Sequence, residues 1–136
     1  MRKATQYPTC PYCNGRSEIR LLKEITGNKQ AKGYAFVCRY YPACDSYIKM
    51  NEQTGKPLGT MANKQLRSLR IEAHRQLYRL YVDGSMSRDE AYEWMASVLN
   101  IPRQEAHIGL FQEYYCQKVI ALAKAECSRR KQRGRR

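Results

Sequence analysis

Cysteines are the residues of this chain best suited to chemistry, and four of the six lie in two close pairs. Two residues separate Cys10 from Cys13, and five separate Cys38 from Cys44. One tight turn presents both thiolates of a pair to a common point, and the segment between the pairs is long enough for a hairpin that brings the turns together. This spacing predicts one structural Zn²⁺ ion held by four thiolates.

Two disulfides are the alternative use of these pairs, and the sequence disfavours them. Cys10 and Cys13 are too close along the chain for an ordinary unstrained bridge. The first residues lack the apolar stretch of a signal peptide, and no apolar run is long enough to span a bilayer. We therefore expect a cytoplasmic protein with no membrane partner, in which thiols stay reduced and free to bind metal.

Catalytic chemistry has little support in the remaining residues. His74 and His107 are the only histidines, and a second metal site or a nucleophilic thiol would need them together with Cys116. Apolar neighbours in an expected helix indicate that Cys116 is a packed, inert thiol. Paired carboxylates for Mg²⁺ and a phosphate-binding glycine loop are both missing from the sequence. We therefore expect no catalytic residues and no enzymatic activity.

Short strands are expected around the cysteine pairs. Residues 18–22 and 33–37 flank a turn at Gly27–Asn28, and residues 46–49 follow the second pair. A unit this small buries little apolar surface, and zinc binding supplies on the order of 10 kcal/mol to its folding. The expected first domain is a zinc ribbon over residues 1–54, followed by a linker over residues 55–60.

Helical periodicity begins after this linker. Apolar residues recur at spacings of three and four from Leu66 to Leu80. A capping-box pattern begins a second helix at Ser87, Pro102 begins a short third one, and a last helix is expected over about 110–127. The expected fold class is α+β, in which the ribbon precedes a bundle of three to four helices over residues 61–128. A basic tail, residues 129–136, is disordered or extends the last helix.

The ribbon region resembles a known group of zinc ribbons. Residues 33–38 read Gly-Tyr-Ala-Phe-Val-Cys, and Tyr41-Pro42 lies inside the five-residue spacing between Cys38 and Cys44. Over residues 10–48 these features are similar to the zinc ribbons at the C-terminal end of bacterial topoisomerase I. Those ribbons bind single-stranded DNA, so the resemblance implies nucleic-acid binding. It implies no strand cleavage, because no tyrosine here corresponds to the topoisomerase nucleophile.

A wider likeness covers about residues 8–122. A ribbon of this type precedes Leu69-Arg-x-x-Ala-His74, then Ala91-Tyr-x-Trp94 and His107-Ile-Gly109. This order resembles a family of phage and bacterial zinc-finger-containing proteins of poorly defined function. The resemblance implies one architecture and no established reaction, in the cytoplasm of a bacterial cell or of a phage-infected host.

Positive charge is unevenly distributed along the chain. The net charge is +13, of which residues 1–60 carry +6, residues 61–128 carry +1 and residues 129–136 carry +6. Solubility alone does not require this segregation, although a solvated basic surface is the simpler explanation for any one residue. Basic surfaces attract phosphate backbones through release of counterions, so the ribbon and the tail are the expected contact regions.

Aromatic residues are concentrated in the ribbon, where a small interior cannot bury all of them. Exposed rings beside basic side chains form a surface on which unpaired bases stack, which favours single-stranded DNA or structured RNA as partner. Tyr34 and Phe36 share one face of an expected strand, where they stack on bases or pack against the helices. The expected contacts are Tyr12, Arg16, Arg20, Lys32, Tyr34, Phe36, Arg39, Tyr40 and Tyr41 in the ribbon, Lys64, Arg67 and Arg75 in the first helix, and Arg129, Arg130, Lys131 and Arg133 in the tail.

A second hypothesis remains from the sequence. The basic surface would also suit an adaptor or inhibitor that binds a host protein or nucleoprotein complex in place of nucleic acid. Tyr40 and Tyr41 separate the two hypotheses, because their loss should abolish binding to bare oligonucleotides only under the first.

Overall fold

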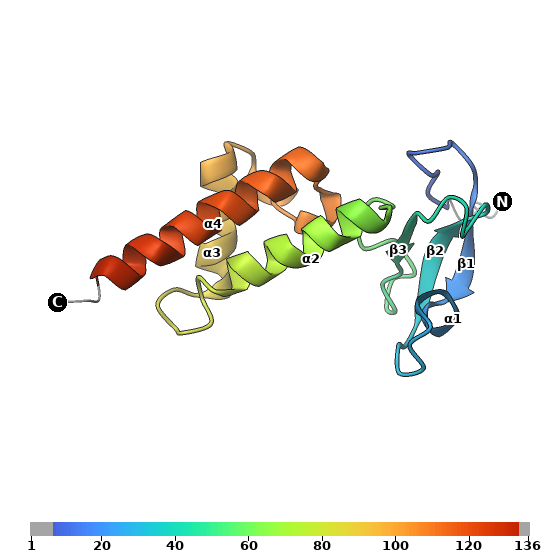
Figure 1. Ribbon diagram of the computed structural model, residues 1–136, viewed down its shortest axis with the longest axis horizontal. Helices are drawn as coiled ribbons and strands as arrows, with labels where there is room; N and C mark the ends of the chain where they lie inside the picture. The colour runs from blue at the N-terminus through green and yellow to red at the C-terminus, as the bar shows by residue number, and fades with distance from the viewer. Residues whose placement is uncertain (1–6, 134–136) are drawn as a thin grey trace. The chain divides into compact units, whose positions relative to one another are not determined.

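The computed structural model describes residues 7–133, and these form two compact units that divide between Gln65 and Leu66 (Figure 1). The first unit contains three strands and one short helix, and the second contains three longer helices and two 3-10 turns. An antiparallel sheet followed by helices is the expected α+β class. Within the described residues, no helix combines the length and the apolar character needed to cross a bilayer.

The ribbon sheet has three antiparallel strands in the order β1-β2-β3 (Figure 1). They are β1, Ser17–Leu21, β2, Tyr34–Cys38, and β3, Tyr47–Lys49, each within one residue of the expected bounds. In the β1–β2 register, Ser17 is opposite Cys38 and Leu21 is opposite Tyr34. This register places the second cysteine pair at the end of the sheet where β1 begins, next to the first pair.

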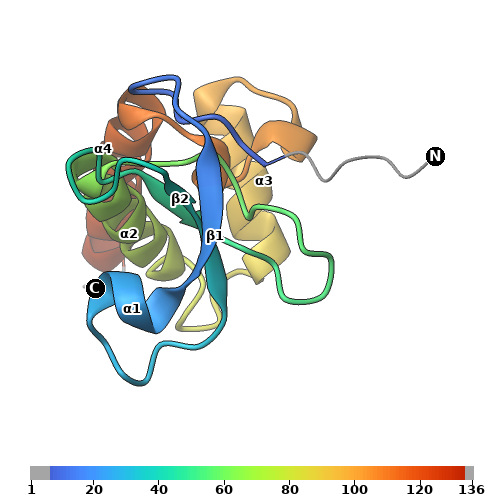
Figure 2. The same ribbon diagram turned by 90° about the vertical axis from the view of Figure 1, so that its right-hand side faces the viewer.

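A short helix, α1 over Leu22–Thr26, follows β1 directly and was not expected (Figure 2). It ends at Gly27, whose φ of 72° is the left-handed conformation that glycine adopts without strain. Leu22 and Ile25 are buried against Ala35 and Val37 of β2, with Tyr41 and Tyr47 at the edge of this cluster. The helix thus covers one face of the central strand with the few apolar side chains available.

Residues 55–60 are not a linker between units, as the sequence predicted, but belong to the ribbon. An isolated bridge pairs Met50 with Pro57, and another pairs Tyr47 with Ala62. Met61 is almost fully buried together with Cys10 and Cys38. Local polarity and two glycines suggested a linker, but the apolar residues that follow them return to the cysteine end of the ribbon.

The second unit is built from α2, Lys64–Tyr78, α3, Arg88–Leu99, and α4, Glu113–Arg133 (Figure 1). Its buried residues follow helical spacings along each helix and include Ala106, Ile108 and Phe111 from the segment before α4. Arg70 of α2 is also buried, and its Nε donates a hydrogen bond to the backbone oxygen of Phe111, 3.0 Å away. This bond ties α2 to the start of α4.

The ends of α3 are those expected from the sequence. The Ser87 side chain accepts a hydrogen bond from the Glu90 backbone, the Glu90 carboxylate accepts one from the Ser87 backbone, and Asn100 ends the helix in the left-handed conformation. The short third helix expected to begin at Pro102 is replaced by two 3-10 turns, over Arg103–Glu105 and Ile108–Leu110, before α4 begins. The predicted start at Pro102 was correct, but the four residues between Pro102 and His107 give room for only one turn.

The beginning of the basic tail is helical. α4 continues through Arg133, so residues 129–133 extend the last helix rather than forming a disordered segment, and residues 134–136 lie outside the described residues. The extension has a physical reason at Arg130, whose guanidinium is held by acceptors from another part of the same unit. These hydrogen bonds stabilise the end of the helix, where the tail has no apolar side chains to pack.

Candidate metal centre and the surface beside it

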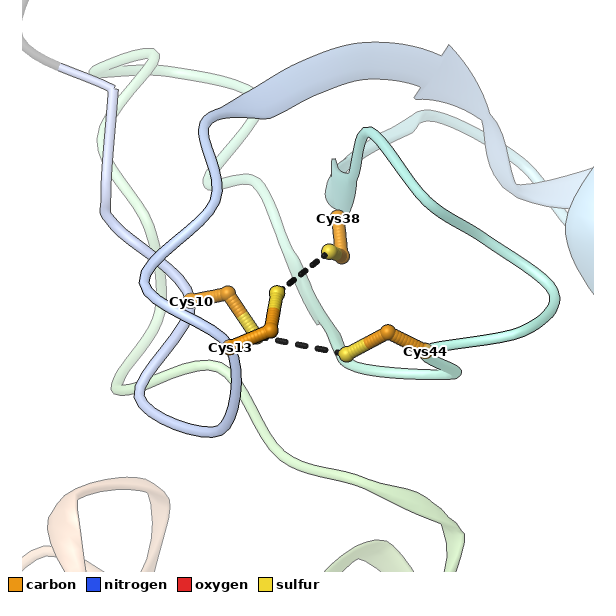
Figure 3. A group of neighbouring side chains, drawn as sticks. All are labelled: Cys10, Cys13, Cys38 and Cys44. Atoms are coloured by element: carbon orange, nitrogen blue, oxygen red, sulfur yellow. Dashed lines mark hydrogen bonds between the residues drawn. The ribbon is translucent and has the colours of Figure 1, made fainter.

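Four cysteine sulfurs converge at one end of the ribbon sheet (Figure 3). Cys10 and Cys13 come from the loop before β1, Cys38 ends β2, and Cys44 lies in the loop before β3. All four sulfurs lie within 4.8 Å of one another, with 3.4 Å between Cys13 and Cys38 and 3.5 Å between Cys10 and Cys44. Four thiolates around Zn²⁺ have sulfurs about 3.8 Å apart, so the donor set and its spacing fit one tetrahedral ion.

Backbone hydrogen bonds form the two turns that aim these thiols. In the first turn, the Asn14 N–H donates to the oxygen of Cys10 at 2.9 Å, and the Cys10 N–H donates to the oxygen of Gly15 at 3.0 Å. In the second, the N–H of Tyr41 donates to the oxygen of Cys38 at 2.9 Å. These hydrogen bonds fix the backbone of each turn in the folded ribbon, so that both thiols of a pair point to one place.

The pKa values of these thiols favour a bound cation. Burial opposes ionisation of Cys10, but the N–H groups of Tyr12 and Cys13 stabilise its thiolate and lower its pKa to about 7. Burial, followed by hydrogen bonding to Cys10, raises the pKa of Cys44 to about 12. Burial also raises the pKa of Cys38. Four adjacent thiolates repel one another, and only a bound cation offsets that repulsion at neutral pH.

Comparison with known proteins identifies the family to which this chain belongs. The zinc-finger-containing domain family matches residues 6–126, which include all four clustered cysteines and most of both units. The chain belongs to this family. No curated protein and no solved structure matches it. The likeness to topoisomerase ribbons stays a prediction, whereas one zinc ion in a zinc-finger-containing domain agrees with both the family and the cysteine geometry.

An exposed aromatic ring lies beside the metal centre of this zinc-finger-containing domain. Tyr40 is 52% exposed, and the guanidinium carbon of Arg39 lies 5.1 Å from the centre of its ring. One edge of the ring, at Cδ2 and Cε2, approaches Gly15 so closely that a Cβ there would be 2.9 Å from a ring carbon. Glycine at this position therefore lets this edge of the ring pack against the first cysteine turn, next to the cysteine cluster.

One hollow adjoins this ring, and a second lies next to the first. The Tyr40 hollow has a volume of about 410 Å³ and is lined by Arg16, Ser17, Glu18, Arg39 and Tyr40. The Tyr7 hollow has a volume of about 350 Å³ and is lined by Tyr7, Pro8, Thr9, Arg16 and Ser17. Because Arg16 and Ser17 line both, the hollows are neighbours on one surface. Arg16, Arg39 and Tyr40 are thus the expected contacts that the fold brings together.

Two expected contacts are corrected by their burial. Phe36 is 1% exposed and packs edge-to-face on Tyr7 with ring centres 5.6 Å apart, so its predicted stacking on bases is wrong. Tyr41 packs against the cluster under α1 and donates a hydrogen bond from Oη to the oxygen of Ile25 at 3.1 Å. Both rings stabilise the ribbon, because β2 is central and both of its faces are covered.

Other expected ribbon contacts lie apart from this surface. Tyr34 is exposed at the opposite end of β2 from Cys38, about 13 Å away for a strand of this length, and Lys32 precedes it. Arg20 lies over the ring of Tyr41 at 5.9 Å. Tyr12 is half-exposed, and its Oη accepts a hydrogen bond from the N–H of Asn63 at 3.1 Å. None of these four residues lines the Tyr40 hollow.

Several basic residues of the second unit already have partners. Arg75 pairs with Glu72 at 3.2 Å, and Arg129 pairs with Glu126. Arg130 also pairs with Glu126, and its guanidinium donates hydrogen bonds to the backbone oxygen of Leu80 and the hydroxyl of Ser85. Lys64 and Lys131 are exposed, Arg67 is half-buried, and the side chain of Arg133 lies outside the described residues. The helical unit thus offers fewer available cations than its sequence indicated.

The remaining reactive groups behave as packed side chains. Cys116 is buried, and this burial raises its pKa to about 11, so the thiol stays protonated. Within the described residues, no second group of metal-ligating side chains accompanies the four clustered cysteines. Sequence reasoning counted Tyr7 among the ribbon aromatics but not among the expected contacts, and it overlooked Glu18. Their position beside the first cysteine turn was the available signal, since any strand beginning there passes the metal centre.

Proposed function

We propose that this zinc-finger-containing domain is a non-enzymatic nucleic-acid-binding protein whose ribbon stacks unpaired bases. Single-stranded DNA or structured RNA is the favoured partner, in the cytoplasm of a bacterial cell or phage-infected host. The observation that carries the proposal is the half-exposed ring of Tyr40, which lines the Tyr40 hollow and is contacted by Arg39 and Gly15. A rigid exposed ring beside two arginines supplies both parts of single-strand binding, a stacking surface and phosphate contacts.

Energetics favour unpaired bases over duplex. Stacking of a base on an aromatic side chain contributes about 1–3 kcal/mol, but the faces of paired bases are covered by their neighbours. Arg16 and Arg39 would meet the phosphates on either side of a stacked base, an interaction that salt weakens. Tyr40 needs little ordering on binding, because its ring is already packed against the first cysteine turn.

Fluorescence anisotropy of the zinc-loaded protein with single-stranded DNA, duplex DNA and hairpin RNA, over a salt series, tests this proposal. We expect a single-stranded or looped partner to bind most tightly, with part of the affinity persisting at high salt. Tyr40→Ala should remove that salt-resistant part, by roughly 5- to 100-fold in affinity. Tyr78→Ala is the matched control, since Tyr78 is similarly exposed at 51% but lies in the helical unit. Equal weak binding to all three partners that disappears near physiological salt would contradict the proposal.

An adaptor or inhibitor of a host protein or nucleoprotein complex is the second candidate. One observation favours it, an apolar hollow of about 300 Å³ on the helical unit lined by Trp94, Val98, Leu122, Ala125, Glu126 and Arg129. Apolar surface that remains open on a small protein is a common feature of protein-binding sites. Under this function, Trp94→Ala would abolish capture of a partner protein while oligonucleotide binding is unchanged.

A further inference from the structure

A carboxylate lies in the Tyr40 hollow among groups otherwise suited to phosphate. Glu18 lines this hollow together with Arg16, Arg39 and the ring of Tyr40. Its side chain is exposed and forms no ion pair or hydrogen bond with the described side chains, although two arginines line the same hollow. A carboxylate repels phosphate, so Glu18 needs a different partner in a bound nucleotide.

We infer that the Tyr40 hollow recognises a single unpaired base and prefers guanine. The base would stack on Tyr40 while the Glu18 carboxylate accepts two hydrogen bonds, from N1–H and from the N2 amino group of guanine. The inference rests on the proposed function, because it assigns a preferred base to the same surface. A volume of about 410 Å³ lies within the range of small-molecule sites, so one base with its sugar fits.

Hydrogen-bond chemistry distinguishes guanine from the other bases at this position. An ionised carboxylate only accepts hydrogen bonds, and its two oxygens best match two parallel donors. Guanine offers two adjacent donors on its Watson–Crick edge. Adenine and cytosine each present one amino group beside a ring nitrogen that repels the carboxylate, and the single N–H of thymine or uracil lies between two carbonyl oxygens. Edges of unpaired bases are accessible to such contacts, unlike those in a duplex.

The neighbouring hollow fits the next nucleotide of the same strand. The Tyr7 hollow shares Arg16 and Ser17 with the Tyr40 hollow, and its ring, Tyr7, is 44% exposed. Arg16 therefore lies where it can contact the phosphate that joins two bases, one in each hollow. The Ser17 hydroxyl donates its hydrogen bond to the backbone oxygen of Pro8, so it does not need an acceptor from the ligand. Only the Tyr40 hollow contains a carboxylate, so we assign base preference to that hollow alone.

The test measures the affinity of the zinc-loaded full chain for ten-nucleotide thymidine strands that carry one central guanine, inosine, adenine or cytosine. A single guanine avoids four-stranded structures. We expect the guanine strand to bind about tenfold more tightly than the adenine or cytosine strand, a typical value for a two-hydrogen-bond contact. The inosine strand, which lacks the N2 amino group, should fall between them.

Glu18→Gln then tests the assigned residue. The variant should bind all four strands with similar affinity, and at least as tightly as the unchanged protein binds the adenine or cytosine strand, because a negative charge near phosphate is lost. Glu24→Gln is the matched control, since Glu24 is exposed on α1 of the same unit and removes the same charge. Zinc content and circular dichroism verify that each variant is folded.

Three results are distinguishable. A guanine preference that Glu18→Gln abolishes and Glu24→Gln preserves supports the inference. Equal affinity for all four strands, or a preference that Glu18→Gln leaves intact, overturns the inference while the proposed function stands. Absence of binding to every strand overturns both.

Discussion

The guanidinium of Arg130 donates a hydrogen bond from Nη1 to the backbone oxygen of Leu80, 3.1 Å away. The same nitrogen lies 3.2 Å from Ser85 Oγ, and Nε donates to the carboxylate of Glu126 at 3.2 Å. These bonds join the end of α4 to the connection between α2 and α3. A residue that the sequence placed in a basic nucleic-acid-binding tail is therefore a structural anchor.

Arg130→Ala should destabilise the helical unit by about 1–2 kcal/mol, because hydrogen bonds from a charged donor are lost and the oxygen of Leu80 loses a partner. Lys131→Ala is the control, since Lys131 is exposed and its loss should change the free energy of unfolding by less than about 0.5 kcal/mol. Urea unfolding followed by circular dichroism measures both variants. Equal stability of the two would show that Arg130 contributes no anchoring.

Removal of zinc should unfold the ribbon and leave the helical unit folded. The ribbon has only small apolar clusters, around Leu22 and around Met61, whereas the helical unit buries its own larger set of residues. A chelator, or Cys38→Ala, should therefore collapse the amide NMR signals of residues 7–62 into the unfolded range and preserve those of α3 and α4. Loss of all dispersed signals together, or retention of the strand signals, would contradict two units with one metal-dependent core.

Neighbouring tyrosines at the second cysteine turn should have opposite effects. Tyr41→Phe removes the hydrogen bond to Ile25 and should lower the stability of the ribbon by about 1 kcal/mol, with oligonucleotide affinity unchanged. Tyr40→Ala should lower affinity with little change in ribbon stability, because that ring is half-exposed. Paired thermal unfolding and anisotropy measurements test the distinction. An equal loss of affinity in both variants would show that Tyr41 also contacts the oligonucleotide and would contradict this distinction.

The imidazole of His74 should titrate below its usual range. Desolvation lowers its pKa most, and the positive charges of Arg88 and Arg70 lower it further. Because the unfolded imidazole binds its proton at higher pH, the folded helical unit loses stability as the pH falls below about 6.5. An NMR titration of the ring measures the pKa directly, and Arg88→Ala should raise it. A pKa of 6.5 or higher in the unchanged protein would contradict this electrostatic environment.

Signals that depend on residue type and short spacing predicted the structure well. The two cysteine pairs were sufficient to predict the metal cluster, because thiolates at these spacings have few other uses. The capping box at Ser87 and the left-handed turn at Asn100 predicted both ends of α3, since cap chemistry is local. Strands were located to within one residue around the turn that precedes Gly33.

Predictions failed where a side chain meets a partner distant in sequence. Strand alternation grouped Tyr34 with Phe36, yet α1 covers one face of β2 and Tyr7 packs on the buried Phe36, so alternation does not predict exposure there. Residues 55–60 have the composition of a linker, but Met61 returns to the cysteine cluster. Glu18 was assigned only to a strand, because nothing local shows that Arg16 and Arg39 line the same hollow.

The most direct test of the central claim is an NMR titration of the zinc-loaded, isotope-labelled protein with a ten-nucleotide single strand. If unpaired bases stack on the ribbon, the largest shift changes occur at residues 7–9, 15–18 and 38–40, and Tyr40→Ala abolishes them. The helical unit, including Lys131, should show only small, salt-sensitive changes. Shift changes confined to the helical unit, or none at any strand concentration, would contradict nucleic-acid binding by the surface beside the metal centre.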